Sequence, residues 1–502
     1  MTLNNSNKRI KIGTIFSYLS IAVNILSGLL FTPWLIRCLG KSDYGLYTLS
    51  ISLINLLLVD FGISAAVSKY ISLANANKNS DEANSYSSLF FSTYLFIDLF
   101  IAIALILMYF FLGNIYTTLA PDELERFRIV YIISASFNII VFPYNSLTSG
   151  ILNSYELFSE QKITSILAKI LPIIAIALLL FFSKSLFLVV LVHSLFSLFA
   201  IMTRILIIHR KTPIRIKPGK LSRTALKGIL GFTAWTAITG IADRILNNIE
   251  PTILGSVAGT SEIAVFGIAV SIESYVYAFT TAINGLFMPR ITKLNLEHND
   301  KKISELMLFV GRILYVLTGL IFVGFICIGR HFIILWVGHD YQIAYYCTIL
   351  LIAPYLFIRP QQIANTTMIV KGYVKPIAIT DIFVLIVTIC LSFLFAAFYG
   401  ALGAAFALCV SSLIGSIAKM FLYKKYLNLD LKVFVIRCYI KIGVPILLCS
   451  IIAVFINVFI KTSIINVLIY GAAITLAFIL ALAIFSFNKD EIKSLIHKIR
   501  KI

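Results

Sequence analysis

A row of polar side chains runs along one apolar stretch of the chain, residues 224–256. Its members recur every three or four residues, which places them on one face of a helix: Thr236, Gly240, Asp243, Asn247 and Glu250. Arg244 stands on the adjoining stripe, about 100° further around the helix. Carboxylates, amides and a guanidinium at this depth predict a helix that lines a transport cavity. Pairing of these groups with neighbouring helices is the alternative.

A milder polar row in residues 12–39 matches the first one. It contains Ser17, Ser20, Asn24 and Ser27. Asn24 precedes Asp243 by 219 positions, the offset of a repeat described below. Two equivalent helices with polar faces predict a central cavity that both of them line. Asp60 and Glu273 add carboxylates within other apolar stretches.

Three further cations, Lys169, Arg312 and Arg359, interrupt apolar stretches. Arg359 precedes Pro360, and a proline inside a helix frees a backbone carbonyl and opens the helix locally. We therefore expect this polar break to line a cavity. Lys169 has an alternative, because a long lysine stem can carry its amine to the cytoplasmic surface.

No catalytic or metal-binding pattern accompanies these groups. The sequence has no phosphate-binding GxxxxGK[ST] loop, no HExxH and no nucleophile elbow, and its six histidines are dispersed. The seven cysteines are scattered without a CxxC pair, which favours apolar packing over a metal site or a disulfide framework. We expect no catalytic residue, no metal and no cofactor, and a protein that is not an enzyme.

The elements that must position the polar groups are membrane helices. Hydrophobic residues make up 60% of the chain and charged residues 13%, whereas soluble domains carry about 25% charged residues. The apolar runs are continuous and long enough to cross a bilayer, which favours helices over a β-barrel. We predict an all-α polytopic membrane protein with about fourteen transmembrane helices. The predicted spans are 12–39, 44–72, 84–112, 126–151, 159–182, 185–209, 224–256, 261–290, 303–328, 341–369, 375–397, 400–425, 432–459 and 464–487.

An internal duplication orders these spans. The segment 40–47 recurs 219 positions later as 259–266, with the same order of small, hydroxyl, acidic and apolar-aromatic residues. Three other landmarks keep an offset of 217 or 218: Pro33 with Pro251, Pro143 with Pro360, and Tyr155 with Tyr373. Because each copy has six spans, both copies start on the same side of the membrane. We therefore predict two parallel six-helix bundles followed by two C-terminal helices.

The duplication sets the expected domains. These are an N-terminal bundle at 1–209, a basic cytoplasmic linker at 210–223, a second bundle at 224–425, and two extra helices with a cytoplasmic tail at 426–502. The formal net charge of +20 is concentrated in segments that this topology places inside the cell, which predicts that both termini are cytoplasmic. We expect no nucleic-acid partner, because the basic clusters lie between spans without an aromatic-basic platform.

The first duplicated loop also carries a family signature. Residues 33–47 fit the pattern P-x-x-x-x-x-L-G-x-x-x-Y-G-x-Y, and residues 60–62 supply the D-x-G that follows it. With these residues the chain resembles, over essentially its full length, polysaccharide flippases of the Wzx type in the multidrug/oligosaccharidyl-lipid/polysaccharide exporter superfamily.

The resemblance implies a twelve-helix core in two bundles, two extra helices and alternating access. Its cargo would be an oligosaccharide linked to undecaprenyl pyrophosphate. This cargo would move from the cytoplasmic to the periplasmic leaflet of the bacterial inner membrane, for O-antigen, capsule or a related polymer. The implied partners are this lipid-linked oligosaccharide, the lipid bilayer, and polysaccharide polymerase and chain-length proteins.

Such a flippase is expected to hold pyrophosphate and glycan in a cationic cavity. Depth and residue type, not a family motif, select the candidates for this cavity: Arg244, Arg359, Lys169, Arg312, Asn24 and Asn247. Arginine and lysine suit phosphate through charge-assisted hydrogen bonds. Transport in this superfamily is expected to be ion-coupled, and four carboxylates are candidates for binding the ion: Asp60, Asp243, Glu250 and Glu273.

Two other functions stay open at this point. A cation-coupled multidrug exporter of the same superfamily would favour an acidic and aromatic chamber, and this sequence places charges of both signs within its spans. A polysaccharide polymerase or ligase is the enzymatic alternative. Such enzymes need a sizeable outer loop to hold the glycan, and the predicted outer loops are short, which disfavours this class.

Overall fold

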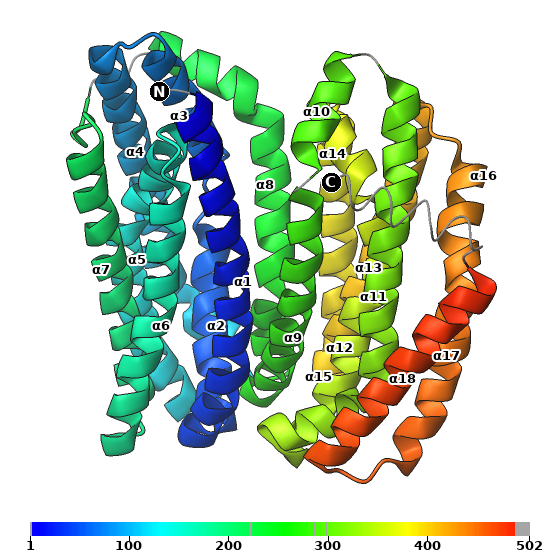
Figure 1. Cartoon of the computed structure of the whole chain (residues 1–502). Coiled ribbons are helices and arrows are strands. Elements are labelled where there is room, and N and C mark those ends of the chain that lie inside the picture. The colour runs from blue at the N-terminus through cyan, green and yellow to red at the C-terminus, as the bar shows by residue number, and fades with distance from the viewer. Residues whose placement is uncertain (1–2, 220–222, 286, 298, 487–502) are drawn as a thin grey trace. The chain divides into compact units, whose positions relative to one another are not determined.

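The computed structural model describes residues 3–219, 223–285, 287–297 and 299–486, with side chains placed at all of these positions except 3–14, 223–233, 283–285 and 289. Every regular element in this part of the chain is a helix (Figure 1). Eleven helical segments there are long and apolar enough to cross a membrane. The prediction of an all-α polytopic membrane protein is confirmed at this level.

Large apolar side chains on the outside of the helices agree with a lipid environment. Phe110 is 71% exposed, Phe181 79% and Phe182 90%. Water would disfavour so much exposed apolar area, whereas lipid tails match it. Packing, not water exclusion, must then hold the helices together.

The chain folds into two units. Unit 1 comprises the chain up to residue 267 together with residues 396–400, and unit 2 comprises 268–395 and the chain from 401 onward. The domain boundaries expected from the sequence, at 209, 223 and 425, stay predictions.

Unit 1 is a helical bundle built around α5 (Figure 1). Its helices are α1 (Leu3–Leu39), α2 (Lys41–Leu57), α3 (Ile63–Ala76), α4 (Ser80–Ile115), α5 (Pro121–Ser154), α6 (Phe158–Phe182), α7 (Leu186–Lys211), α8 (Arg223–Val257) and the first turns of α9 (Thr260–Gly285). Helix α5 packs against α2, α3, α4, α6 and α7, while α1 packs along α6 and α2 along α8. Val130, Leu147 and Ile151 of α5 are completely buried, so van der Waals contacts around this helix hold the bundle.

The second predicted span of the chain is broken in the middle. Helix α2 ends at Leu57 and α3 begins at Ile63, and the sequence analysis expected one continuous span over 44–72. Phe61 and Gly62 adopt left-handed backbone conformations, with φ of 52° and 71°, which a continuous helix does not allow. Irregular backbone at membrane depth is tolerated where it lies inside protein or lines a cavity.

Unit 2 is built around the long helix α11. Its helices are the rest of α9, α10 (Met288–Leu296), α11 (Asp300–Val337), η1 (His339–Tyr341), α12 (Ile343–Ile352), α13 (Tyr355–Ile358), η2 (Arg359–Gln361), α14 (Gln362–Val370), α15 (Val374–Leu427), α16 (Leu431–Phe434), η3 (Val435–Ile440), α17 (Lys441–Phe459) and α18 (Ile464–Phe485). Helix α11 packs against α12, η2, α17 and α18. Val310, Leu314 and Cys327 of α11 are fully buried in this core, where Cys327 serves as an apolar filler.

Two interruptions in the second half of the chain lie where the sequence predicted them. Residues 359–361 form a short tight turn between α13 and α14, at the polar break expected beside Pro360. Gly400, with φ of 53°, separates α15 into two helices, in the place where the spans 375–397 and 400–425 were predicted to meet.

The duplicated loops share one backbone conformation. Gly40 has φ of 84° and Gly259 has φ of 90°, and each glycine directly precedes a helix, α2 or α9. Glycine is favoured at such positive φ values because it has no Cβ. The offset between these glycines, read from the sequence, therefore corresponds to a structural equivalence.

Candidate functional site

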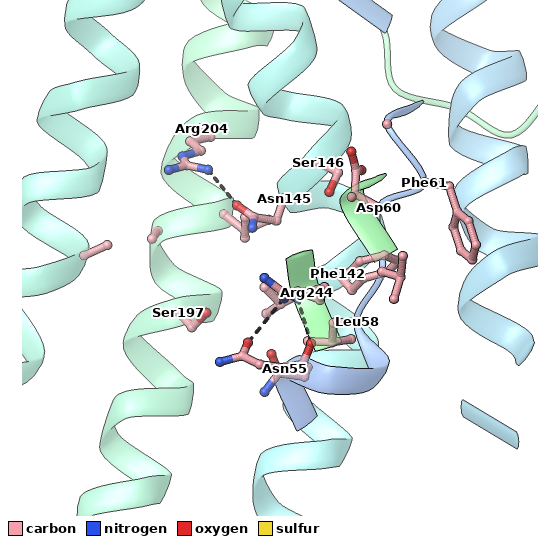
Figure 2. Close-up of a pocket in the computed structure, with 18 of the residues that line it drawn as sticks. Asn55, Leu58, Asp60, Phe61, Phe142, Asn145, Ser146, Ser197, Arg204 and Arg244 are labelled. Carbon is pink, nitrogen blue, oxygen red and sulfur yellow. Dashed lines mark hydrogen bonds between the residues drawn. The ribbon is translucent and has the colours of Figure 1, made fainter. Parts of the chain in front are cut away.

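A cavity of about 570 Å³ lies inside unit 1 (Figure 2). Its walls come from the end of α2, the break that follows it, and helices α5, α6, α7 and α8. Its polar lining residues are Asn55, Asp60, Asn138, Asn145, Ser146, His193, Ser197, Arg204, Thr236 and Arg244. This volume falls within the usual range for sites that bind small molecules, about 300–1,000 Å³.

The broken helix exposes a backbone carbonyl that an arginine caps. In a continuous helix, the carbonyl of Asn55 would accept a hydrogen bond from the amide of Val59, but that amide bonds to the carbonyl of Leu57 instead. Nε of Arg244 donates to the Asn55 carbonyl oxygen at 2.7 Å, and Nη2 donates to Asn55 Oδ1 at 3.3 Å (Figure 2). Asn55 thus aims the guanidinium without neutralising it.

Asp60 stabilises the other side of the break. Its Oδ2 accepts hydrogen bonds from the amide of Ser64 at 3.2 Å and from the Ser64 hydroxyl at 2.8 Å, so it caps the first turn of α3. Its Oδ1 accepts a hydrogen bond from the hydroxyl of Tyr94 in α4 at 2.6 Å. Three donors therefore hold this carboxylate in place, and its charge also attracts the nearby guanidinium of Arg244.

Arg204 of α7 is the most buried cation of the cavity, with 9% of its surface exposed. Nη1 donates to Asn145 Oδ1 at 2.7 Å (Figure 2). It also donates to Ser149 Oγ at 3.5 Å. Nε donates to Thr164 Oγ1 at 3.3 Å, and Nη2 donates to Ser165 Oγ at 3.1 Å. All four partners are neutral, and no carboxylate of the described chain pairs with this guanidinium, so its charge stays uncompensated.

At the matching place in the second predicted copy, a half-buried lysine has a carboxylate partner. In α15, Lys419 Nζ lies 2.7 Å from Asp381 Oδ1, and Asp381 is 7% exposed. Asp381 follows Thr164 by 217 positions, so the second copy carries a carboxylate where the first copy carries a hydroxyl. A buried ion pair is a structural solution, whereas a buried cation without a counter-charge is costly, which makes Arg204 a candidate site residue.

The charge of the cavity follows from these contacts. Its charged lining residues are Arg204, Arg244 and Asp60, so with His193 neutral the lining carries net positive charge. A guanidinium has five N–H donors. Arg244 uses two of them on Asn55, and one N–H on Nη2 of Arg204 has no partner within the described chain. Both arginines thus retain donors for an anion.

A second cavity of about 120 Å³ continues the first one. The two share Asn55, Asn138 and His193 as lining residues. The second cavity extends along α2 and α5 toward the N-terminal ends of these helices, where Ser50 and Ser134 line it. Polar groups therefore line a path within unit 1 from Arg204 to beyond His193.

Unit 2 holds its own buried cation, Arg359, which is 5% exposed. Its guanidinium carbon lies 3.9 Å from the ring centroid of Tyr355 and 4.6 Å from that of Tyr277. Glu273 of α9 is close enough to attract it electrostatically. Arg359 thus sits in an aromatic pair with a nearby carboxylate, at the break between α13 and α14.

The structure brings two predicted site residues, Arg244 and Asp60, into one cavity, and it places Arg359 beside Glu273 in unit 2. The other predicted residues do not line the cavity of Figure 2. Asn24, Lys169, Asp243 and Asn247 are exposed on α1, α6 and α8, Glu250 of α8 is 2% exposed, and Arg312 lies on α11. The roles assigned to all of these residues stay predictions.

Sequence reasoning missed Arg204, His193, Asn138 and Asn145. Arg204 lies near the end of its span, before the basic cluster that starts at His209. A signal was present, since His193, Ser197 and Arg204 stand four and seven residues apart and share one helical face. Its significance depends on α5, whose asparagines face the same cavity.

Comparisons with known proteins agree with the fold. Residues 10–295 match the family described as Polysaccharide biosynthesis protein. No curated protein matches the sequence. Among solved structures, a lipid II flippase, MurJ, in an inward closed conformation is 18% identical with a TM-score of 0.69, covering 94% of this chain and 98% of that chain.

An inward-facing multidrug resistance MATE family transporter of the MOP superfamily is 14% identical with a TM-score of 0.64, covering 84% of this chain and 98% of that one. An outward-facing MATE transporter gives 15% identity and a TM-score of 0.57, covering 84% and 96%. At these identities, the likeness shows a shared fold.

Proposed function

The chain belongs to the polysaccharide biosynthesis protein family, and on that premise we propose that it is a flippase for lipid-linked oligosaccharides. It moves an undecaprenyl-pyrophosphate-linked oligosaccharide from the cytoplasmic to the outer leaflet of a bacterial inner membrane, by alternating access. The polymer that this cargo serves is O-antigen, capsule or a related surface polysaccharide. The observation that carries the proposal is the cationic cavity of unit 1.

The chemistry of the cavity suits a phosphorylated glycan. Arg244 has donors to spare and is held by one side chain and one carbonyl, so it can form a forked hydrogen bond to phosphate oxygens. Arg204 adds a second positive charge with one open donor. Asn138, Ser146 and Ser197 offer the amide and hydroxyl groups that sugar hydroxyls require.

The remaining predicted site residues take secondary roles in this proposal. Arg359 provides a cation in unit 2, and Lys169, Arg312, Asn24 and Asn247 stay candidates for contact with the glycan or the pyrophosphate. Ion coupling would use a carboxylate that exchanges a proton or Na⁺ between states: Asp60, Asp243, Glu250 or Glu273. The hydrogen bonds to Asp60 favour a structural role for this residue in the state described.

We propose fourteen passes through the membrane with both termini in the cytoplasm. Eleven helical segments qualify directly. The division of α15 at Gly400, the broken pair α2–α3 and the polar helix α8 supply the other three. Polysaccharide polymerase and chain-length proteins are the proposed partners on the outer side.

The competing function is cation-coupled drug export, which the MATE fold also serves. A chamber for organic cations needs free carboxylates, and the one carboxylate among the cavity-lining residues, Asp60, is already bonded to Ser64 and Tyr94. The positive lining of the cavity therefore favours an anionic cargo.

Deletion of the gene in its native host tests the proposal. We expect surface polysaccharide to be lost and the lipid-linked oligosaccharide to accumulate in the cytoplasmic leaflet, with rescue by the wild-type gene. A matched pair of variants tests the cavity itself. Arg244→Met, in the cavity, should reduce surface polysaccharide, whereas Arg128→Met, on the exposed face of α5, should leave it unchanged. Normal polysaccharide in the deletion strain, or ethidium efflux that depends on the protein, would refute the flippase.

A further inference from the structure

The duplicated loops, which the site does not use, meet at one carboxylate. Glu123, in the first turn of α5, accepts a hydrogen bond on Oε1 from the Ser42 hydroxyl at 2.5 Å and another from the Thr260 hydroxyl at 2.8 Å. Its Oε2 accepts a hydrogen bond from the amide of Ala120 at 3.1 Å, which fixes the side chain to its own helix. Ser42 lies in the first turn of α2 and Thr260 is the first residue of α9, each within one of the duplicated segments 40–47 and 259–266.

The helices that follow the two loops also touch at equivalent positions. A Cβ at Gly45 would overlap the carbonyl oxygen of Thr260, so only glycine permits this approach. Thr48 and Gly267, which are 219 positions apart like the duplicated segments, are in close contact: a Cβ added at Gly267 would lie 3.0 Å from the methyl group of Thr48. Contact between equivalent positions is the mark of a two-fold arrangement. The start of α2 and the start of α9 thus form one junction, with Glu123 across it.

The junction stands at the end of the polar path. The second cavity runs along α2 as far as Ser50 and Tyr47, and along α5 as far as Ser134. Ser42 lies eight residues before Ser50 on α2, about 12 Å further along the helix axis. The junction therefore lies beyond the end of the polar path, on the side away from the cavity of Arg244.

The contacts at this junction connect different pairs of helices. Asp43 and Arg126 form an ion pair at 3.2 Å that joins α2 to α5 independently of Glu123. The Thr260 bond instead joins α5 to the loop of the second copy. Loss of the Ser42 bond leaves a second tie between the same two helices, whereas loss of the Thr260 bond removes the link from this carboxylate to the other copy.

We propose that Glu123 is a positioning residue for transport, a latch that holds the outer end of the polar path shut until the second-copy loop separates from it. The outer location rests on the proposed function, which places the start of α2 on the outer side of the membrane. The carboxylate does not touch cargo. It sets how often the outer end opens.

Labelling of a single cysteine tests the latch. In a cysteine-free background, Ser50→Cys places a thiol on the wall of the second cavity, at a position 1% exposed in the closed junction. A membrane-impermeant maleimide is added outside intact cells and the labelling rate is measured. Thr260→Val should raise this rate about tenfold, as expected for the loss of one hydrogen bond to a charged acceptor. Glu123→Ala should raise it further.

Three controls separate the latch from general loosening. Thr260→Ser keeps the hydroxyl and should label like the parent. Ser42→Ala leaves the Asp43–Arg126 pair intact and should raise the rate much less than Thr260→Val. Glu125→Ala removes an exposed carboxylate from the same turn and should have no effect. Thermal unfolding midpoints close to the parent's would show that each variant is folded.

The two proposals fail separately. Equal labelling of Thr260→Val and Thr260→Ser would overturn the latch, even if the gene is needed for surface polysaccharide. A higher rate in Thr260→Val, together with normal polysaccharide in a strain without the gene, would keep the latch and overturn the flippase. Labelling that rises equally in Ser42→Ala and Thr260→Val would also overturn the latch, because it would show loosening of the whole helix end.

Discussion

Replacement of Arg204 by methionine should weaken cargo binding while costing the fold little. The guanidinium is 9% exposed and bonded only to neutral groups. Its hydroxyl partners keep other bonds when it is removed, since Thr164 and Ser165 both donate to the Gln161 carbonyl, at 2.9 and 2.8 Å. No buried donor is left without a partner, and methionine fills a similar volume with flexible apolar atoms.

Two opposing terms set the size of the change in stability. Burying an ion costs several kcal/mol, and the hydrogen bonds that Arg204 makes offset part of this cost at about 1.5–3 kcal/mol each. We therefore expect Arg204→Met to change the free energy of unfolding by no more than about 2 kcal/mol. For binding, loss of one charge-assisted hydrogen bond predicts about 10- to 150-fold weaker affinity for a pyrophosphate headgroup.

Lys419→Met is the matched control. It removes a cation from the corresponding helices of the second copy, but it leaves Asp381 buried without its partner. Breaking a buried pair from one side costs about 3–5 kcal/mol, so this variant should lose far more stability than Arg204→Met. Asp381 would then be the buried charge without compensation.

The assay has two readouts on purified protein in mixed micelles. Unfolding is followed by tryptophan fluorescence, and binding is titrated with undecaprenyl pyrophosphate, with uncharged undecaprenol as the control lipid. A loss of about 3 kcal/mol or more in Arg204→Met would refute the reasoning, because it would mean that Arg204 has a structural counter-charge. Unchanged affinity for undecaprenyl pyrophosphate would refute its role in the site.

Two further predictions concern the broken helix. Arg244→Lys keeps the charge but loses the forked hydrogen bond of the guanidinium, so we expect about tenfold weaker binding of undecaprenyl pyrophosphate. Asn55→Ala should weaken binding less, because the shorter bond from Arg244, to the carbonyl of residue 55, survives. Equal effects of the two variants in the same titration would contradict this order. Asp60→Ala removes the cap of α3 and the acceptor for Tyr94, for a loss of about 2–4 kcal/mol in unfolding. Tyr94→Phe should reproduce part of that loss and should add little to Asp60→Ala, and full additivity would show that the two residues act independently.

Much of the architecture was predictable because it depends on local patterns. Runs of apolar residues indicate membrane helices by length alone, and the structure confirms the all-α membrane class. The motif at residues 33–47 and the D-x-G at 60–62 predicted a polysaccharide flippase of the exporter superfamily. The chain matches the polysaccharide biosynthesis protein family, and MurJ and a MATE transporter share its fold. The offset of 219 was also reliable, since Gly40 and Gly259 share one unusual conformation.

The same patterns were less informative about the site. Arg244 and Asp60 were selected by depth and charge, and both line the cavity. Asn24 and Asp243 were selected by the same criterion but lie on exposed faces. A polar row on one helix shows which residues share a face, but it does not show what that face meets.

The sequence by itself determined the membrane class and the polysaccharide biosynthesis family, and it predicted the duplication, because hydrophobic length, motif and repeat offset are all read along one dimension. Only the tertiary structure decided that Arg204 stands uncompensated while Lys419 is paired, since charge balance depends on which helices converge. It also decided that α2 breaks at Asp60 and that Glu123 joins two loops 218 residues apart, Ser42 and Thr260. Such contacts form only when distant segments pack together, and no local spacing contains them.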